Sequence, residues 1–212
     1  MKDNFTRIAI VLDRSGSMES CKESTVSGFN EFVRSQKQIP GEATVKLVQF
    51  DDQYETVFDK RLEDCPELNQ STFMPRGSTA LLDAQGRTIV ELGQELAALP
   101  KQERPSKVIV VTLTDGLENA SQHYNLEKIG ELIREQRDKY HWDFVFLGAN
   151  QDAIETAAAM NIPLPSAMSY STSKAGIAAT MAAVSHYVGA ARGGKAAAFS
   201  AEDRKAAMEK DA

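Results

Sequence analysis

Short apolar runs, rich in β-branched and aromatic residues, recur along the chain. They are nearly continuous rather than alternating, which is typical of parallel strands that are covered on both faces. Four of them predict central strands at residues 8–12, 45–50, 108–113 and 144–147. A shorter run at residues 167–170 predicts a last strand.

Between these runs, apolar residues follow the period of 3.6 that is typical of amphipathic helices. Strands that alternate with helices predict a doubly wound sheet with helices on both faces. The three stripes consist of Val26, Phe29 and Val33, then Leu82, Ile89, Leu92, Leu96 and Leu99, and finally Leu126, Ile129 and Ile133.

One segment breaks the alternation. The run at residues 45–50 is separated from residues 54–62 by Asp51-Asp52-Gln53, which leaves no room for a helix. This spacing predicts a hairpin and hence one antiparallel strand, and the charges at residues 59–61 suit an exposed edge. We therefore predict an α/β fold with a doubly wound, mostly parallel six-stranded sheet in the order 3-2-1-4-5-6, flanked by helices.

The C-terminal part predicts an alanine-rich helix from Ser173 to about Ala191. We expect its apolar stripe to pack on the sheet, and the chain from Arg192 onward to be held less tightly. Ser200 and Asp203 have the spacing of a capping box that begins a short last helix. We assign a domain to residues 1–171 and a helical extension, docked or trailing, to residues 172–212. The stripe consists of Ile177, Met181, Val184 and Val188.

The length and charge of the chain limit the classes of protein to which it can belong. Its 212 residues suit one α/β domain, and its net charge of -6 disfavours sequence-independent nucleic-acid binding. No run approaches the roughly 20 apolar residues of a membrane span, and the N-terminus has no signal-peptide pattern. Cys21 and Cys65 have no metal-ligand spacing, and we expect both to be reduced thiols. These features favour a cytoplasmic, bacterial-type protein without nucleic-acid or membrane partners.

Three polar loops follow predicted strands or begin a predicted helix. In open α/β sheets such loops meet at the carboxyl ends of the strands, beside the first strand. Their carboxylates and hydroxyls are hard ligands that suit Mg²⁺ or Mn²⁺ better than a thiophilic metal. Taken alone, Asp13 or Asp115 could instead cap a helix or a turn. The loops are Asp13-Arg14-Ser15-Gly16-Ser17, Arg76-Gly77-Ser78-Thr79-Ala80-Leu81 and Thr112-Leu113-Thr114-Asp115-Gly116.

Together these motifs resemble the metal-ion-dependent adhesion site of von Willebrand factor A domains. The resemblance extends over roughly residues 5 to 170, and the order of the elements agrees, including the antiparallel edge strand. It implies that Ser15, Ser17 and Thr79 ligate a metal through their hydroxyls. It also implies that Asp13 and Asp115 contact the ion directly or through water. The ion is expected to be Mg²⁺, with Mn²⁺ or Ca²⁺ as alternatives.

The resemblance further implies a protein partner that supplies an Asp or Glu carboxylate to the remaining position on the ion. The chemistry agrees, because three neutral hydroxyls and two carboxylates leave the charge of a divalent ion under-compensated. The chain is therefore predicted to be a metal-dependent protein–protein interaction module. The alternative is a regulatory or assembly subunit of an AAA+ ATPase, as in chelatase-like or stress-resistance systems.

Enzyme functions fit the motifs less well. A phosphatase of the haloacid-dehalogenase type needs a second acid two residues after its aspartate nucleophile, and that position holds Ser15. The first loop does not match a nucleophile elbow, and the sequence has no P-loop or dinucleotide-binding fingerprint. We therefore expect no catalytic activity. Asp83, Glu118 and Asn119 lie in the matching loops and are expected to support the site or to be solvated.

Overall fold

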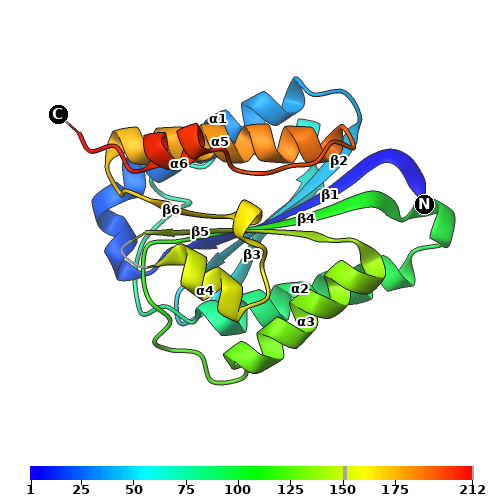
Figure 1. The fold of residues 1–212 in the computed structure, drawn as a ribbon, viewed down its shortest axis with the longest axis horizontal. Coiled ribbons are helices and arrows are strands. Elements are labelled where there is room, and N and C mark those ends of the chain that lie inside the picture. Colours follow the sequence, from blue (N-terminus) through cyan, green and yellow to red (C-terminus); the bar gives the residue numbers. More distant parts are fainter. Residues whose placement is uncertain (150–151, 212) are drawn as a thin grey trace.

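The computed structural model describes residues 1–149 and 152–211. They form a sheet in the order β3-β2-β1-β4-β5-β6 (Figure 1). The β2–β3 pair is antiparallel and the other neighbouring pairs are parallel, so the predicted fold is confirmed. The strands are β1 (Lys2–Asp13), β2 (Glu42–Phe50), β3 (Tyr54–Arg61), β4 (Pro105–Thr114), β5 (Asp143–Ala149) and β6 (Ala167–Tyr170).

Helices cover both faces of the sheet: α1, α5 and α6 lie on one face, and α2, α3 and α4 on the other (Figure 1). Within residues 1–149 and 152–211, no helix is long and apolar enough to cross a membrane. The helices are α1 (Lys22–Lys37), α2 (Leu81–Ala98), α3 (Leu126–Tyr140), α4 (Ala153–Ala159), α5 (Lys174–Arg192) and α6 (Ala201–Ala207). Short 3-10 helices span Gly16–Cys21, Leu62–Asp64, Lys101–Glu103 and Leu164–Ser166.

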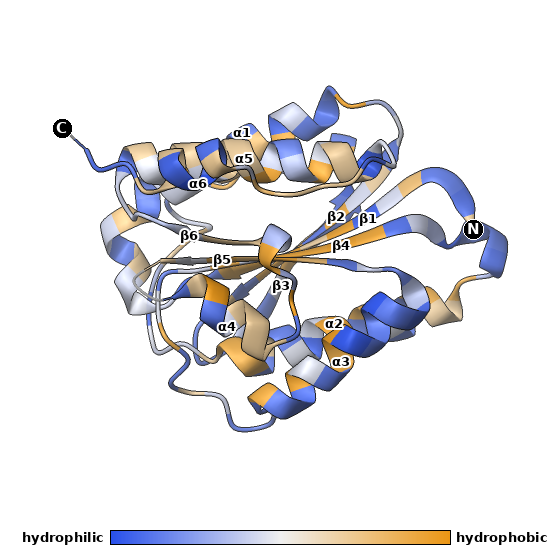
Figure 2. Ribbon diagram, viewed as in Figure 1, coloured by the Kyte–Doolittle hydropathy of each residue, from blue (hydrophilic) through white to orange (hydrophobic). Residues whose placement is uncertain are grey.

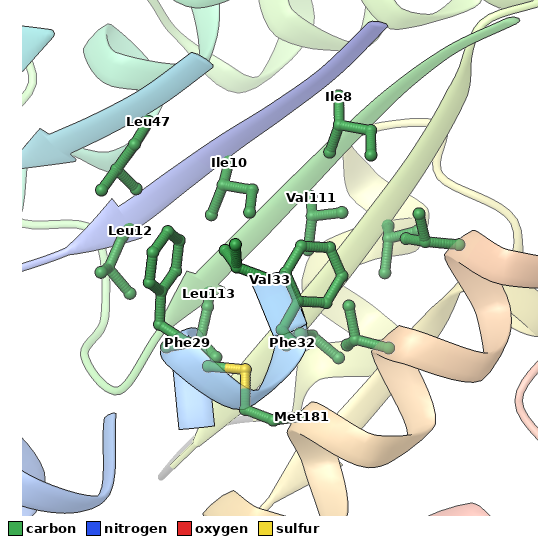
Figure 3. Packing of buried hydrophobic residues seen from close by; sticks show 14 of the residues in the cluster. Ile8, Ile10, Leu12, Phe29, Phe32, Val33, Leu47, Val111, Leu113 and Met181 are labelled. Atoms are coloured by element: carbon green, nitrogen blue, oxygen red, sulfur yellow. The ribbon is translucent and has the colours of Figure 1, made fainter. Parts of the chain in front are cut away.

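Alternate residues of the central strands supply two separate cores. Ile10 and Leu12 of β1 point to the face of α1 and α5, whereas Ala9 and Val11 point to the opposite face. Figure 3 shows Ile10 and Leu12 packing beside Phe29 of α1. The strands are accordingly apolar, while the helices carry their polar residues on the outside (Figure 2). Both faces of the sheet are thus sealed by helices, and ligands can approach at the strand ends.

The α5 stripe is part of the first core. Its four predicted residues, Ile177, Met181, Val184 and Val188, are all buried. At Gly28 of α1, an added Cβ would lie 2.6 Å from Met181 Cγ, so the two helices are in close contact. The domain boundary at residues 171/172 stays a prediction, although α5 shares this core with β1 and β4.

The chain from Arg192, the last residue of α5, onward is held more closely than predicted from the sequence. The Arg192 guanidinium donates to the carbonyl oxygens of Gln36 at 2.7 Å and Gly41 at 3.0 Å. Beyond it, the predicted capping box of Ser200 and Asp203 is present at the start of α6. Arg204 of α6 donates to the carbonyl oxygens of Ala167 and Leu164, at 2.6 and 2.8 Å. Carbonyl groups beside β6 and at the end of α1 thus provide anchors that apolar periodicity does not reveal.

Candidate metal centre

The three polar loops meet at the carboxyl ends of β1 and β4, which are neighbours in the sheet. Leu12 pairs with Leu113, so that Asp13 and Thr114 end their strands side by side and Asp115 follows directly. The second loop joins them through the backbone, since Gly16 N–H donates to the Gly77 carbonyl at 3.2 Å. The topology therefore brings together the loops that the sequence singled out.

Hydrogen bonds connect four of the five predicted ligands. The Ser17 hydroxyl donates to Asp115 Oδ1 at 2.6 Å, and the Oγ atoms of Ser15 and Ser17 are 3.2 Å apart. Asp13 Oδ1 accepts the Ser15 N–H at 2.6 Å, and Asp13 Oδ2 accepts the Thr114 hydroxyl at 2.6 Å. Asp13, Ser15 and Asp115 are buried, whereas Ser17 is exposed and forms the solvent side of the cluster.

Thr79 completes the cluster beside Gly116. A Cβ added at Gly116 would lie 3.1 Å from Thr79 Oγ1, 3.6 Å from Ser17 Oγ and 3.9 Å from Ser15 Oγ. The three hydroxyl oxygens thus face one small space, which any side chain at position 116 would enter. A donor set of hydroxyls and carboxylates around such a space fits a hard divalent cation.

The electrostatics of the two carboxyl groups favour a cation. Burial raises the pKa of Asp13 to about 6; the Asp115 charge adds to this, and hydrogen bonds from Thr114 and Ser15 oppose it. Burial also raises the pKa of Asp115, against the hydrogen bond from Ser17. A divalent ion between them would stabilise both charged forms.

Asp83, Glu118 and Asn119 hold the loops together. Asn119 Oδ1 accepts the Thr79 N–H at 2.9 Å, and the Asn119 N–H donates to the Thr79 carbonyl at 3.0 Å. Glu118 accepts the Leu82 N–H at 2.9 Å. Asp83 accepts the N–H groups of Gln122, His123 and Tyr124. These bonds fix the start of α2 against the loop after β4, which is a supporting role.

Sequence reasoning missed an ion-pair cluster beneath the first two loops. Asp51 is fully buried, and its Oδ2 accepts Arg14 Nε at 3.1 Å and Arg76 Nε at 2.8 Å. Its Oδ1 accepts the Gln53 N–H at 2.6 Å, and Arg14 also donates to Glu55 at 2.6 Å. Burial opposes the charge of Asp51, but the bonds from Arg76 and Gln53 and the Arg14 charge keep its pKa below the usual value. The cluster ties the β2–β3 turn to both loops.

Replacing Asp51 is expected to destabilise the fold. Asp51→Ala leaves the buried Arg14 without its buried partner, and breaking such a pair costs about 3–5 kcal/mol. Because Arg14 keeps Glu55, we expect a loss of about 3 kcal/mol in the free energy of unfolding, measured by urea denaturation. Asp52→Ala removes the exposed neighbouring acid and should change this value by less than about 0.5 kcal/mol. Equal losses in both variants would contradict the role of Asp51.

Two further residues reach the site from within the core. Thr114 was part of a recognised motif, but its bond to Asp13 was not predicted. The Tyr170 hydroxyl donates to the Thr114 carbonyl at 3.1 Å, and burial raises the pKa of Tyr170 well above its usual value, so it stays a neutral donor. Tyr170 thereby connects β6 to the strand end that carries Asp115.

Clusters of the more usual metal-binding residues are absent from the part of the chain that the structure describes. No group of three or more His, Cys, Asp or Glu side chains could hold a metal there. Cys21 and Cys65 are free and buried. A metal at the three loops would therefore depend on hydroxyl ligands.

The sheet order and the cluster of hydroxyls and carboxylates at the ends of β1 and β4 define a doubly wound α/β domain with a candidate cation site. The family model of the von Willebrand factor type A domain matches residues 8–118, which include all five predicted ligands. The chain belongs to this family.

Solved structures resemble the chain in fold at low sequence identity. One of them is proximal thread matrix protein 1 from the mussel byssus, solved with zinc in its metal-ion-dependent adhesion site (MIDAS) motif. It has a TM-score of 0.62 and 18% identity, and the match covers 89% of this chain and 47% of that one. A von Willebrand factor type A protein from Catenulispora acidiphila has a TM-score of 0.56 and 15% identity, and the match covers 88% of this chain and 42% of that one. The pilus adhesin SpaC from Lactobacillus rhamnosus GG has a TM-score of 0.61 and 14% identity, and the match covers 89% of this chain and 31% of that one. The chain thus spans less than half the length of these neighbours. No curated protein sequence matches it.

Proposed function

We propose that the chain is a metal-dependent protein–protein interaction domain. Domains of this family commonly have that function. The observation that carries the proposal is the set of three hydroxyls facing one space beside Gly116, next to two buried carboxyl groups. The proposed ligands of the ion, Mg²⁺ in the first place and Mn²⁺ or Ca²⁺ as alternatives, are Asp13, Ser15, Ser17, Thr79 and Asp115.

The bound ion would supply a positive position for an Asp or Glu carboxylate of a protein partner. Hydroxyl ligands add no negative charge, so an incoming carboxylate meets less repulsion than at a site built from acids alone. A partner would reach the ion from the side of the exposed Ser17. The buried Asp13 is held in place by the hydrogen bond from the Thr114 hydroxyl. The chain's own residues would thus hold the ion, with the exposed Ser17 on the solvent side of the site.

We also propose that the chain binds rather than catalyses. Ser15 stands where a phosphatase of the haloacid-dehalogenase type needs its general acid, and its hydroxyl lies against Ser17 instead. A cytoplasmic location is part of the proposal, and the two free, buried thiols of Cys21 and Cys65 support it.

Thermal unfolding with Mg²⁺ tests the metal site. At a concentration tenfold above its dissociation constant, an ion that binds the folded state stabilises it by about 1.4 kcal/mol. For a chain of this size that corresponds to a rise in Tm of roughly 3–6 °C. The double variant Ser15→Ala/Ser17→Ala loses two of the three hydroxyls and should show no rise.

Ser78→Ala is the matched control for this experiment, since Ser78 is an exposed serine of the second loop outside the proposed ligand set. It should respond to Mg²⁺ as the wild type does. A double variant with an undiminished response would place the ion elsewhere.

A further inference from the structure

A groove runs between α1 and α5 on the outside of the domain, with a volume of about 1080 Å³. The two helices meet at its floor, where Gly28 of α1 lies against Met181 of α5 and Phe32 adds apolar surface. They run in the same direction, since further along both helices Gln36 donates to the Ser185 carbonyl at 3.0 Å. An apolar groove of this size is typical of a surface that another protein covers.

The outer edge of α5, which borders the groove, is a single ridge. The exposed residues of α5 follow one another at intervals of four, so they lie in one row along the helix. The middle of the row is formed by two alanines, whereas the exposed residues of α3 are mostly charged. A ridge with such small side chains can pack closely into a groove of another helix pair. The α5 ridge consists of Lys174, Ala178, Ala182 and His186.

The α1 side of the groove carries acids that match the two ends of this ridge. Glu23 and Glu31 are exposed and line the groove, as Lys174 and His186 do from α5. Measured from the contact of the two helices at Gly28, Glu23 and Lys174 lie about 7.5 and 10.5 Å toward the helix starts. Glu31 and His186 lie about 4.5 and 7.5 Å toward the helix ends. Each acid is therefore level, within about 3 Å, with a group that can donate to a carboxylate.

We propose that a second copy of this chain covers the groove, in a two-fold symmetric dimer in which the α5 ridge of each copy packs into the α1–α5 groove of the other. A two-fold axis along the helices keeps their direction and exchanges the α1 and α5 sides. Lys174 of one copy then faces Glu23 of the other, and His186 faces Glu31. An axis across the helices would place α1 on α1 and α5 on α5, with like charges opposed.

The dimer would carry its two candidate metal centres on the same side. Both α1 and α5 begin at the carboxyl ends of the strands, because α1 follows the first polar loop and α5 follows β6. An axis along the helices turns these ends of both copies in one direction. A partner with two carboxylates would then be held at two points, which raises its apparent affinity. This consequence rests on the proposed metal-dependent function, whereas the dimer itself does not.

Charge reversal on the two sides of the groove tests the dimer. The full chain is analysed by sedimentation velocity in EDTA, at concentrations up to about 200 μM. We expect the wild type to dimerise, and Glu23→Lys/Glu31→Lys and Lys174→Glu/His186→Glu each to raise the dissociation constant at least about tenfold, because like charges then face each other. An equal mixture of the two variants should dimerise again, since the lysines on α1 of one copy meet the glutamates on α5 of the other. This recovery would also show that both variants fold.

Glu127→Lys/Glu135→Lys is the matched control. Both acids are exposed and lie on α3, which covers the opposite face of the sheet (Figure 1). They are eight residues apart, as Glu23 and Glu31 are. In each helix the first of the two acids stands in the first turn, and the second pairs with a basic residue of its own helix. The control should dimerise as the wild type does.

Three results would overturn the inference. The first is a wild type that stays monomeric up to this concentration, and the second is a dimer that all three double variants retain. The third is recovery when Glu23→Lys/Glu31→Lys is mixed with the wild type rather than with Lys174→Glu/His186→Glu, since α1 then packs on α1. Because every measurement is made without metal, none of these results bears on the proposed metal site, which the Mg²⁺-induced rise in Tm tests separately.

Discussion

Deletion of residues 173–212 is expected to leave a protein without a cooperative unfolding transition. The deletion removes α5, and with it the buried side chains of Ile177, Met181, Val184 and Val188. Burial of such a side chain contributes roughly 1.5–3 kcal/mol, so the four together contribute about 6–12 kcal/mol. The total stability of a domain is about 5–15 kcal/mol. The measurements are thermal and urea unfolding followed by circular dichroism.

A shorter deletion separates the two parts of this segment. A chain that ends after Gly194 keeps α5 but loses α6, the buried Phe199 and the bonds from Arg204 to the carbonyls beside β6. It should still unfold cooperatively, at a lower temperature. An unchanged melting temperature after deletion of residues 173–212 would show that α5 is not part of the core.

The fold could be predicted because its determinants are local in the sequence. Continuous apolar runs marked strands covered on both faces, and the three-residue gap before residue 54 excluded a helix and required a hairpin. Right-handed crossovers then left few possible strand orders. The 3-10 helix Gly16–Cys21 was not predicted, because its residues have no distinctive periodicity.

The candidate site could be predicted only in part. Asp13, Thr79 and Asp115 stand at element ends, so topology alone brings their loops together. The bond between Arg14 and Asp51 joins residues 37 positions apart, and that between Tyr170 and Thr114 joins residues 56 positions apart. Such contacts depend on the directions of side chains in the folded core, which no local pattern specifies. The assignment of the five ligands itself stays a prediction.

Asp115→Ala is expected to abolish Mg²⁺-dependent binding of carboxylate peptides while the circular dichroism spectrum stays nearly unchanged. Asp115 follows β4, which lies between β1 and β5, so the backbone on which it stands is fixed by its neighbours. The substitution also removes the acceptor of the Ser17 hydroxyl. With one carboxylate fewer, the proposed site would hold Mg²⁺ less well against water, which this ion releases reluctantly. The partner carboxylate of the proposed function would then have no cation to bind, and the interface would lose its central anchor.

Glu19→Ala is the matched control, because Glu19 is an exposed acid in the 3-10 helix Gly16–Cys21, which begins within the first polar loop, and is not a proposed ligand. It should bind the same carboxylate peptides as the wild type does. EDTA should abolish this binding in the wild type and in Glu19→Ala, as Asp115→Ala does.

A phosphatase would behave differently: it would hydrolyse a generic phosphate ester, and Asp13→Asn would stop turnover. Peptide binding by the wild type that is equally strong in EDTA would refute metal-dependent recognition for this chain. The fold would be unaffected by that result, since its stability comes from the two cores on either side of the sheet.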